Sequence, residues 1–256
     1  MDDTGNLQRR VGKRGGKRLG TRSRQHQASS DAGVDSKKSQ QSQETRDRIL
    51  DSAEELFSSH GLYGVTVRNV ATHAAVDTAL IHYYFGTKRG LFDAVFERRA
   101  EGINAARLAA MNAYEAECGD QITIRGALRA FLQPILDEDR QNDPGWRNYS
   151  ALVALANNSK EWGGEMMSRL FDDVIRRLIV LLKRAMPEAR DEDLYWSYQM
   201  LSGSLMLLQA NTGRIELLSG GVCRSDDVDA FGERLIEFAS SGFEALCLDG
   251  QQSKNA

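Results

Sequence analysis

The stretch TVRNVATHAAVDTALIHYYFGTKRGLF, residues 66–92, contains two short helical patterns separated by only a few residues. The first pattern begins at Thr66, a residue type that often caps helices. Its apolar side chains share one face of a helix, while Arg68 points elsewhere: Val67, Val70, Ala71 and Ala74. The stretch therefore predicts a short amphipathic helix close to a second one.

The second pattern follows Asp77, which can cap a helix that Gly86 ends. Its spacing places three side chains near the core and leaves the others outward: Ile81, Tyr84 and Phe85 inside, Thr78, Ala79, His82 and Tyr83 outside. Two short helices joined by a tight turn, the second with outward polar groups, are typical of a helix-turn-helix DNA reader. The second helix would enter the major groove.

Helical periodicity continues on both sides of this stretch. Upstream, Ile49, Ala53, Leu56 and Phe57 predict an amphipathic helix that Gly61 can end, and downstream Thr87 can cap a long helix. Beyond residue 100 the segments that indicate helix are 120–139, 145–157, 160–186, 190–218 and 227–248. No sustained strand alternation occurs. We therefore predict an all-α protein, with a three-helix DNA-binding domain followed by a larger helical domain.

The charge is distributed unevenly along the chain. Residues 1–41 contain ten Lys and Arg against four Asp, a net charge of +6, so the remainder carries -9 of the total of -3. A basic arm ahead of an acidic body suggests phosphate contact. The alternative is a solvated tail, because this stretch has too few large apolar side chains to fold. Both interpretations predict a disordered arm.

Composition excludes several other classes of protein. The longest apolar run, LIVLL at 178–182, is too short to span a membrane, and the amino terminus lacks a secretory signal, so we expect a soluble cytoplasmic protein. Three separated cysteines predict free thiols. The histidines have no metal-ligand spacing, and no nucleotide-binding or hydrolase motif occurs. We expect no metal, cofactor or catalytic residue.

The helix-turn-helix stretch resembles the amino-terminal domain of the TetR family of bacterial regulators. The resemblance is strong over residues 44–92 and depends on Thr66 to Val70, the turn at 75–77, the aromatic run at 83–85 and Lys88 with Leu91-Phe92. It implies four regions: a disordered basic arm (1–43), the DNA-binding domain (44–92), a helical effector-binding and dimerisation domain (93–248), and a flexible tail (249–256). No membrane partner is implied.

The resemblance and the chemistry of the side chains together predict the DNA contacts. Lys88 would lie in the first turn of a helix, which suits a cation only if a phosphate is also there. Thr66, Arg68 and Tyr83 offer further phosphate contacts. Thr78 and Ala79 would meet base edges or thymine methyl groups, with Asp77 capping their helix.

Three residues leave alternatives open, and one departs from the family pattern. The family often has tyrosine at the position of His82, which either donates to a phosphate or only faces solvent. A turn glycine of the family is Ala75 here. Leu80 would either touch a thymine methyl group or pack internally, and Tyr84 is better explained by the core than by DNA contact.

The last two predicted helices are apolar on more than one face, which predicts a subunit interface. In residues 190–218 one apolar stripe consists of Leu194, Tyr198, Leu201, Leu205 and Leu208. Further apolar surface around this stripe comes from Trp196, Met200, Met206 and Leu207. In the final helix the stripe is Phe231, Leu235, Phe238 and Leu246, with Ile236 and Phe243 off it. Two core faces are the alternative. A homodimer also fits a palindromic operator, because one short helix reads few base pairs.

The resemblance also implies a small-molecule effector. Aromatic and thioether side chains that suit a hydrophobic or aromatic ligand are Trp146, Tyr149, Trp162, Met166, Met167, Trp196 and Met200, although plain core is the alternative for each. We therefore expect a ligand-responsive homodimeric repressor that binds double-stranded operator DNA. The alternatives are an activator or a ligand-independent regulator of the same fold and, less favoured, a helical enzyme with a DNA-binding unit.

Overall fold

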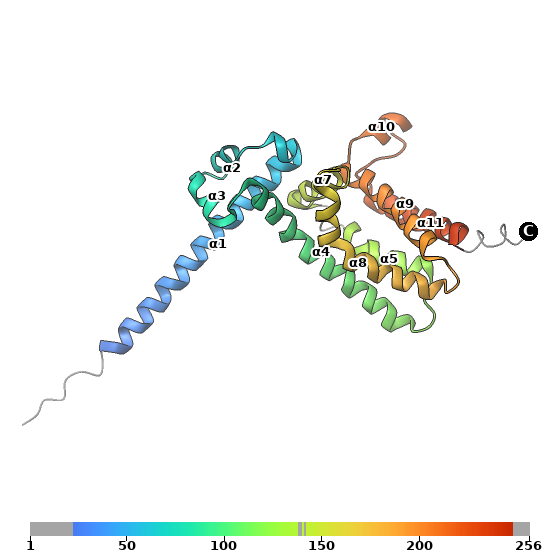
Figure 1. The fold of residues 1–256 in the computed structure, drawn as a ribbon, viewed down its shortest axis with the longest axis horizontal. Helices are drawn as coiled ribbons and strands as arrows, with labels where there is room; N and C mark the ends of the chain where they lie inside the picture. Colours follow the sequence, from blue (N-terminus) through green and yellow to red (C-terminus); the bar gives the residue numbers. More distant parts are fainter. Residues whose placement is uncertain (1–22, 138–139, 141, 248–256) are drawn as a thin grey trace, which may run out of the picture. The chain divides into compact units, whose positions relative to one another are not determined.

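Figure 1 shows the chain in a computed structural model, which describes residues 23–137, 140 and 142–247. The regular structure of these residues is helical, which confirms the predicted all-α fold. The helices are α1 (Ser23–Gly64), α2 (Val67–His73), α3 (Thr78–Phe85), α4 (Lys88–Cys118), α5 (Ile124–Leu136), α7 (Pro144–Asn157), α8 (Gly163–Ala185), α9 (Asp191–Ala210), α10 (Arg214–Ser219) and α11 (Val228–Cys247). Within the described ranges, no helix is both long and apolar enough to cross a membrane.

The contacts divide the chain into two units, residues 1–45 and 46–256. In the first unit the structure differs from the predicted disordered arm, because α1 begins at Ser23 rather than near residue 44. Residues 37–44 are exposed, so this part of the helix exists without a core. The prediction of disorder rested on the lack of apolar side chains to bury. That lack does not prevent a helix from continuing through Gln, Ser and Lys, which all tolerate helical backbone. Residues 1–22 and the tail 249–256 lie outside the described residues.

The second unit begins with a three-helix arrangement of α1 (from Arg46), α2 and α3, packed on the first turns of α4. The predicted apolar faces are buried, as the inward residues show: Ile49, Ala53, Phe57, Val70, Ala71, Ala74 and Ile81. Phe57 meets Phe92 edge to face, with ring centroids 5.0 Å apart. The Phe57–Phe92 contact joins α1 to α4, and buried Ile81 holds α3 against the same core while the opposite side of α3 faces solvent.

Side-chain caps start α2, α3 and α4 where the sequence predicts them. Thr66 accepts a hydrogen bond from the Asn69 amide, Asp77 from the Ala79 amide and Thr87 from the Gly90 amide. Gly61 interrupts α1 with a positive φ of 68°, although helical backbone resumes and continues to Gly64. The predicted starts of α2, α3 and α4 are therefore confirmed, whereas the helix that Gly61 was expected to end continues to Gly64.

The larger helical layer consists of α4, α5, α7, α8, α9 and α11. In it α4 packs against α5 and α8, α7 packs against α9, and α11 packs against α5 and α9. The predicted helix over 190–218 is wrong, because it breaks after Ala210 into α9 and the short α10. Asn211 takes the left-handed conformation at the C-cap of α9, with φ 39°, and Gly213 does the same just before α10.

Candidate DNA-binding surface and effector cavity

Helix α3 presents a narrow polar face with one apolar side chain. Asp77 Oδ1 accepts from the Ala79 amide at 2.7 Å, so Asp77 serves as a cap in the structure. Thr78 and Ala79 are exposed, whereas Ile81 is buried. Leu80 is 37% exposed, which places it on the outward side with Thr78 and Ala79. The first turn of α3 is therefore open to a groove.

The turn between α2 and α3 is held by the long helix behind it. Arg48 Nε donates to the Ala74 carbonyl oxygen at 3.0 Å, and the Val76 amide donates to the Ala71 carbonyl at 3.0 Å. Ala75 has a φ of 52°, a conformation that glycine adopts readily and alanine does not. These contacts fix α3 relative to α2 in spite of that strain.

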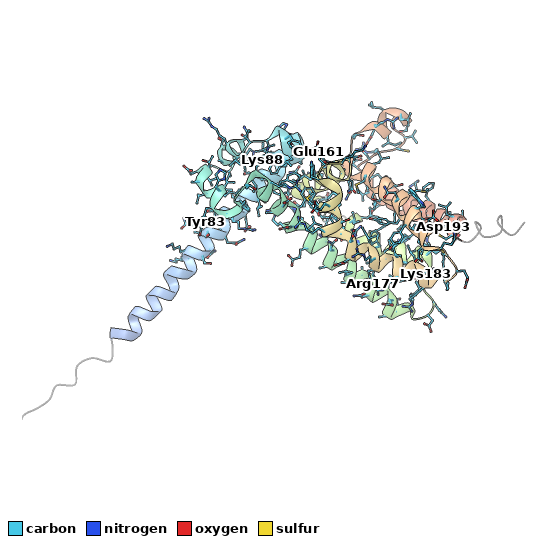
Figure 2. The ribbon with its side chains drawn as sticks, viewed as in Figure 1. Tyr83, Lys88, Glu161, Arg177, Lys183 and Asp193 are labelled. Atoms are coloured by element: carbon cyan, nitrogen blue, oxygen red, sulfur yellow. The ribbon has the colours of Figure 1, made fainter. Side chains whose placement is uncertain are left out.

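The aromatic run at the end of α3 separates into an exposed ring and supporting rings. Tyr83, labelled in Figure 2, is 80% exposed and meets Tyr84 edge to face at 5.2 Å. Tyr84 and Phe85 pack against the core, as predicted for Tyr84, and the Arg46 guanidinium lies 5.5 Å from the Phe85 ring centroid. Tyr83 is therefore the aromatic residue that a DNA backbone could reach.

Lys88, at the start of α4 (Figure 2), is tied back to the beginning of the helix-turn-helix. Its Nζ donates to the Val65 carbonyl oxygen at 3.0 Å, a contact that the sequence does not predict. Since Val65 precedes Thr66, this bond brings Lys88 close to Thr66. An ammonium group has three N–H donors, so two remain for a phosphate.

Two predicted phosphate contacts have competing partners inside the chain. Thr66 Oγ1 donates to Asn69 Oδ1 at 2.5 Å, so its only proton is engaged in the capping box. His82 Nδ1 lies 2.8 Å from the Gly86 carbonyl oxygen, which requires a proton on Nδ1. Neutral His82 then offers an acceptor at Nε2, and only the imidazolium could donate to a phosphate. Arg68 is exposed on α2.

A cavity of about 190 Å³ lies in the larger helical layer, between α4, α5, α7, α8 and α9. Of the residues predicted for an effector site, the structure places Trp146, Tyr149 and Met167 on its wall. Four other residues predicted for an effector site do not line this cavity. Met166 is buried in the core, and Trp162 meets Phe92 edge to face with ring centroids 5.0 Å apart. Trp196 and Met200 are 58% and 57% exposed.

Sequence reasoning missed the polar part of the cavity wall, which includes Arg107, Tyr198 and Gln209. Arg107 is 7% exposed although it carries a charge. Its position gives a signal, because Ile103, Arg107 and Met111 recur every four residues and so share one buried face of α4. A charged residue within an apolar stripe marks an interior site or a close partner.

A group of ion pairs joins the DNA-binding helices to the wall of the cavity. Glu54 of α1 is 2% exposed and accepts from Arg98 at 2.6 Å and from Arg99 at 2.9 Å, both on α4. Arg99 also pairs with Asp143 at 3.0 Å, and Asp143 caps α7 through the Gly145 amide at 2.9 Å. Helix α7 carries Trp146 and Tyr149, so α1, α4 and the cavity wall share one network.

Burial of Asp143 alone would raise its pKa. The Gly145 backbone N–H and the Arg99 guanidinium outweigh burial and hold the pKa of Asp143 below its ordinary value of 3.8. The carboxylate of Asp143 is therefore the form that the α1–α4–α7 network stabilises.

Two family models match the chain. The one described as "Bacterial regulatory proteins, tetR family" matches residues 49–95, and the one described as "Tetracyclin repressor-like, C-terminal domain" matches residues 129–242. The first covers α2, α3 and the start of α4, and the second covers most of the cavity wall.

Curated relatives match the chain over part of their length. The chain is 38% identical over 69 residues to the HTH-type transcriptional repressor NicS of Pseudomonas putida, covering 27% of this chain and 32% of that protein. It is 32% identical over 107 residues to the HTH-type transcriptional regulator AcrR of Shigella flexneri, covering 41% and 48%. These alignments span about a third to a half of the relatives' length.

Solved structures are similar over most of the fold. The hemolysin II transcriptional regulator HlyIIR aligns with a TM-score of 0.53 at 18% identity, covering 76% of this chain and 98% of that one. A putative tetR family regulator from Shewanella sp. PV-4 aligns with a TM-score of 0.57 at 15% identity, covering 80% and 98%. At this identity the likeness shows a shared fold.

Proposed function

The chain belongs to the TetR family of bacterial regulators, and from that premise we propose that this transcriptional regulator is a homodimeric repressor released from a palindromic operator by a small effector. The observation that carries the proposal is the exposed first turn of α3, followed in the chain by two side chains that can contact the DNA backbone. Thr78 and Ala79 are open to a groove, while Tyr83 and Lys88 stand at the two ends of the aromatic turn. Phosphate contacts of this kind position a reader, and base contacts give it specificity.

Dimerisation is supported by an apolar face that has no cover within the described chain. On α9 the residues Trp196, Met200 and Leu207 are 58%, 57% and 75% exposed, and on α11 Phe238 is 72% exposed. Gly203 and Gly242 lie on the same helices with open space where a Cβ would be, so two such helices from a second copy could approach closely. We therefore propose that α9 and α11 form the subunit interface.

The final helix also corrects the predicted stripe. Ile236 and Phe243 are buried against the core of their own chain, while Phe238 and Leu246 are 72% and 41% exposed. Apolar periodicity identifies two faces on a helix, but it does not say which face meets the chain's own core.

The ion-pair network supports release by an effector. A ligand in the cavity contacts α7 and α4, and the same helices hold Glu54 of α1 through Arg99 and Asp143. A ligand that fits better when these helices shift would favour a spacing of the two α3 helices that no longer suits grooves about 34 Å apart.

The test is a fluorescence anisotropy titration of the full chain against DNA from upstream of its own coding sequence, compared with scrambled DNA at several salt concentrations. We expect one protected palindromic site in footprinting and at least about a thousandfold preference over scrambled DNA. Equal affinity for both DNAs would refute operator binding. If the protein binds the operator but activates transcription in a reporter assay, the proposed DNA-binding surface stands and only the role as a repressor is refuted.

A further inference from the structure

The cavity wall contains a cation in an otherwise apolar part of α4. Arg107 is 7% exposed, and its Nε donates to the Phe131 carbonyl oxygen at 3.3 Å. Its guanidinium lies 4.0 Å from the centroid of the Phe131 ring. Within the described residues, no carboxylate forms an ion pair with Arg107, unlike Arg98 and Arg99 on the same helix.

Arg107 keeps its charge in this position. Burial lowers the pKa of Arg107 to about 10, which leaves the guanidinium protonated at neutral pH. A buried cation is normally paired, because removing a charge from water is unfavourable unless an opposite charge or several hydrogen bonds replace the water. One carbonyl oxygen and a ring face leave most of its N–H donors for another acceptor.

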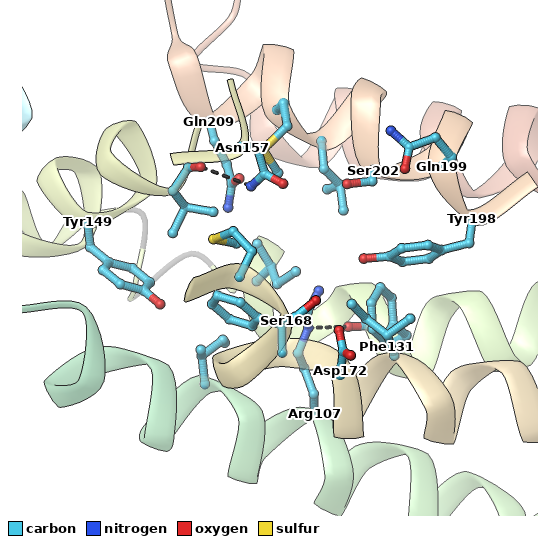
Figure 3. A pocket seen from close by; sticks show the side chains of 18 of the residues that line it. Arg107, Phe131, Tyr149, Asn157, Ser168, Asp172, Tyr198, Gln199, Ser202 and Gln209 are labelled. Carbon is cyan, nitrogen blue, oxygen red and sulfur yellow. Dashed lines mark hydrogen bonds between the residues drawn. The ribbon is translucent and has the colours of Figure 1, made fainter. Parts of the chain in front are cut away.

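Further polar atoms of the cavity wall have no hydrogen-bond partner among the described residues. They are the Tyr149 hydroxyl, Trp146 Nε1 and Gln209 Oε1, all buried. In Figure 3 the hydroxyls of Tyr149 and Tyr198 point into the cavity from opposite sides, one from α7 and one from α9. Two hydroxyls and an indole N–H are, like the guanidinium, donors to an oxygen anion.

The wall also contains one carboxylate, Asp172, which opposes an anion unless it is neutralised. Asp172 Oδ2 accepts from Arg176 NH2 at 2.9 Å, one turn further along α8. The Asp172 side chain is 37% exposed and lines the same cavity as Arg107, which is 7% exposed and has no ion pair among the described residues. The uncompensated charge in the interior is therefore positive.

The wall is of mixed character, with further polar side chains such as Asn157 and Ser202 beside its apolar ones, and the space is small. Phe131, Phe171, Val153 and Met206 line it, and its volume is about 190 Å³. A cavity of about 150 Å³ accepts benzene. The space therefore suits one aromatic ring or a short alkyl chain together with a small polar group.

We propose that the effector is a small amphipathic carboxylate whose carboxyl group pairs with Arg107 and whose apolar body lies against Phe131 and Phe171. The proposal rests on the proposed function, in which this cavity is the effector site. A planar guanidinium binds the two oxygens of a carboxylate in parallel, and the Tyr149 and Tyr198 hydroxyls can donate to the same group. The ligand would thereby supply the counterion that the described chain lacks at Arg107.

Calorimetric titration of the full chain without DNA tests the proposal with matched probes. Benzoate, phenylacetate and hexanoate are compared with benzamide, phenylacetamide and hexanamide, which keep the shape and lose the charge. We expect at least one acid to bind at least about tenfold more tightly than its amide, because hydrogen bonds to charged groups are the stronger ones. Equal affinity within every pair, or no binding of any acid at millimolar concentration, would overturn it.

Two variants assign the preference to Arg107. In Arg107→Met, which keeps the apolar stem, the acid should lose its advantage over the amide, whereas Arg107→Lys should retain part of it. Arg169→Met is the matched control, since Arg169 lies on α8, pairs with Glu97 and does not line the cavity. A preference that survives in folded Arg107→Met overturns the assignment. If Arg107→Met does not fold, Arg107→Lys and the wild-type pairs decide it.

This outcome is separate from that of the proposed function. Ligand binding is measured without DNA and operator binding without ligand, so either can fail alone. An acid that binds without changing operator affinity supports the charge assignment and refutes release by an effector. If only the neutral amides dissociate the operator complex, the proposal that the effector is a carboxylate is refuted.

Discussion

Ala75 shows how a single backbone angle limits this fold. Its φ of 52° places a β-carbon in the left-handed region, at a cost of about 1–2 kcal/mol. The turn survives because Arg48 and the Val76 amide bond the carbonyl oxygens on the end of α2. The strain sits directly before α3, whose direction the turn determines.

Ala75→Gly should stabilise the protein. Glycine removes the left-handed strain but has a more flexible unfolded chain, so we expect a net gain of about 0.5–1 kcal/mol in the free energy of unfolding. Urea unfolding followed by circular dichroism measures it, with unchanged operator affinity as the companion result. A lower stability would mean that the turn differs from the one described. The matched control is Ala79→Gly, at an exposed helical position, which should destabilise.

Lys88 and Thr78 should affect DNA binding in different ways. Lys88→Ala would remove the proposed phosphate contact, so affinity should fall by a similar factor for all sequences and the slope of log K against log salt should decrease by about 1. It should also destabilise the fold slightly, because the bond to the Val65 carbonyl is lost. Anisotropy titrations at four salt concentrations measure the slope.

Thr78→Ala is the companion variant, because it leaves the residues proposed to contact phosphate unchanged. It should alter preference at one or two base pairs while leaving the salt slope unchanged. Selection of binding sites from a randomised DNA pool gives the preference. If Thr78→Ala selects the wild-type site unchanged, the first turn of α3 does not read bases.

At the residue scale, features that depend on neighbouring residues could be predicted from the sequence, whereas features that depend on distant parts of the chain could not. Caps at Thr66, Asp77 and Thr87 are readable because the capping side chain and the amide that it accepts from are three residues apart or fewer. Arg107 was missed as a cavity residue because its surroundings come from α5, α7, α8 and α9, distant in sequence.

At the scale of elements, the buried carboxylate of Glu54 holds three helices together. It is 2% exposed and accepts from Arg98 and Arg99, whose side chains are 23% and 24% exposed. Removing one partner of such a group leaves unpaired buried charge. The joint between α1, α4 and α7 is therefore sensitive to a change at Glu54.

Glu54→Gln should lower the free energy of unfolding by about 3 kcal/mol, the low end for a broken buried pair, because both arginines keep some contact with water. Thermal unfolding of the variant and the wild type measures it. Glu97→Gln is the control, since the Glu97–Arg169 pair is half exposed on both sides and should contribute little. Equal effects of the two substitutions would argue against a special role of the joint.

The Asp143 pair should make stability depend on pH in a defined window. The pKa of Asp143 is lowered from 3.8, so its contribution is present above 3.8 and is lost as pH falls through the lower pKa of the folded state. Asp143→Asn should therefore lower the melting temperature at about pH 6 but much less at about pH 3. A difference that is constant across this range would show that the charge of Asp143 contributes nothing.

The element that sequence reasoning extended wrongly was the helix at 190–218. Asn211 ends α9 by taking the left-handed conformation, which Asn tolerates better than most residues. The apolar residues that follow, Ile215, Leu217 and Leu218, kept the helical pattern continuous in the sequence, yet they belong to α10 and are exposed. Periodicity alone passes over such a break.

At the scale of the whole molecule, α9 and α11 leave a face that predicts association. Phe238→Glu should convert a dimer to a monomer and weaken operator binding at least tenfold, because each monomer would present only one reading helix. Sedimentation velocity gives the mass. Val180→Glu is the control, since Val180 is 51% exposed on α8, outside the proposed interface, and should remain dimeric.

A Phe238→Glu protein that sediments as a dimer would refute α9 and α11 as the interface. The existence of an extra apolar face was predictable from helical periodicity. Its assignment was not, because Phe238 and Phe243 have the same hydrophobicity and differ only in what packs against them.

Helix α4 connects the helix-turn-helix to the cavity through one continuous helix. Lys88, bonded to Val65 at the DNA reader, and Arg107, in the cavity, belong to one continuous helix and are separated by 19 residues, about 28 Å at 1.5 Å per residue. A tilt of about 5° around Arg107 displaces the Lys88 end by about 2.4 Å, close to half a helical turn. The sensitivity of such a regulator would therefore be set by arm length as well as by affinity for its ligand.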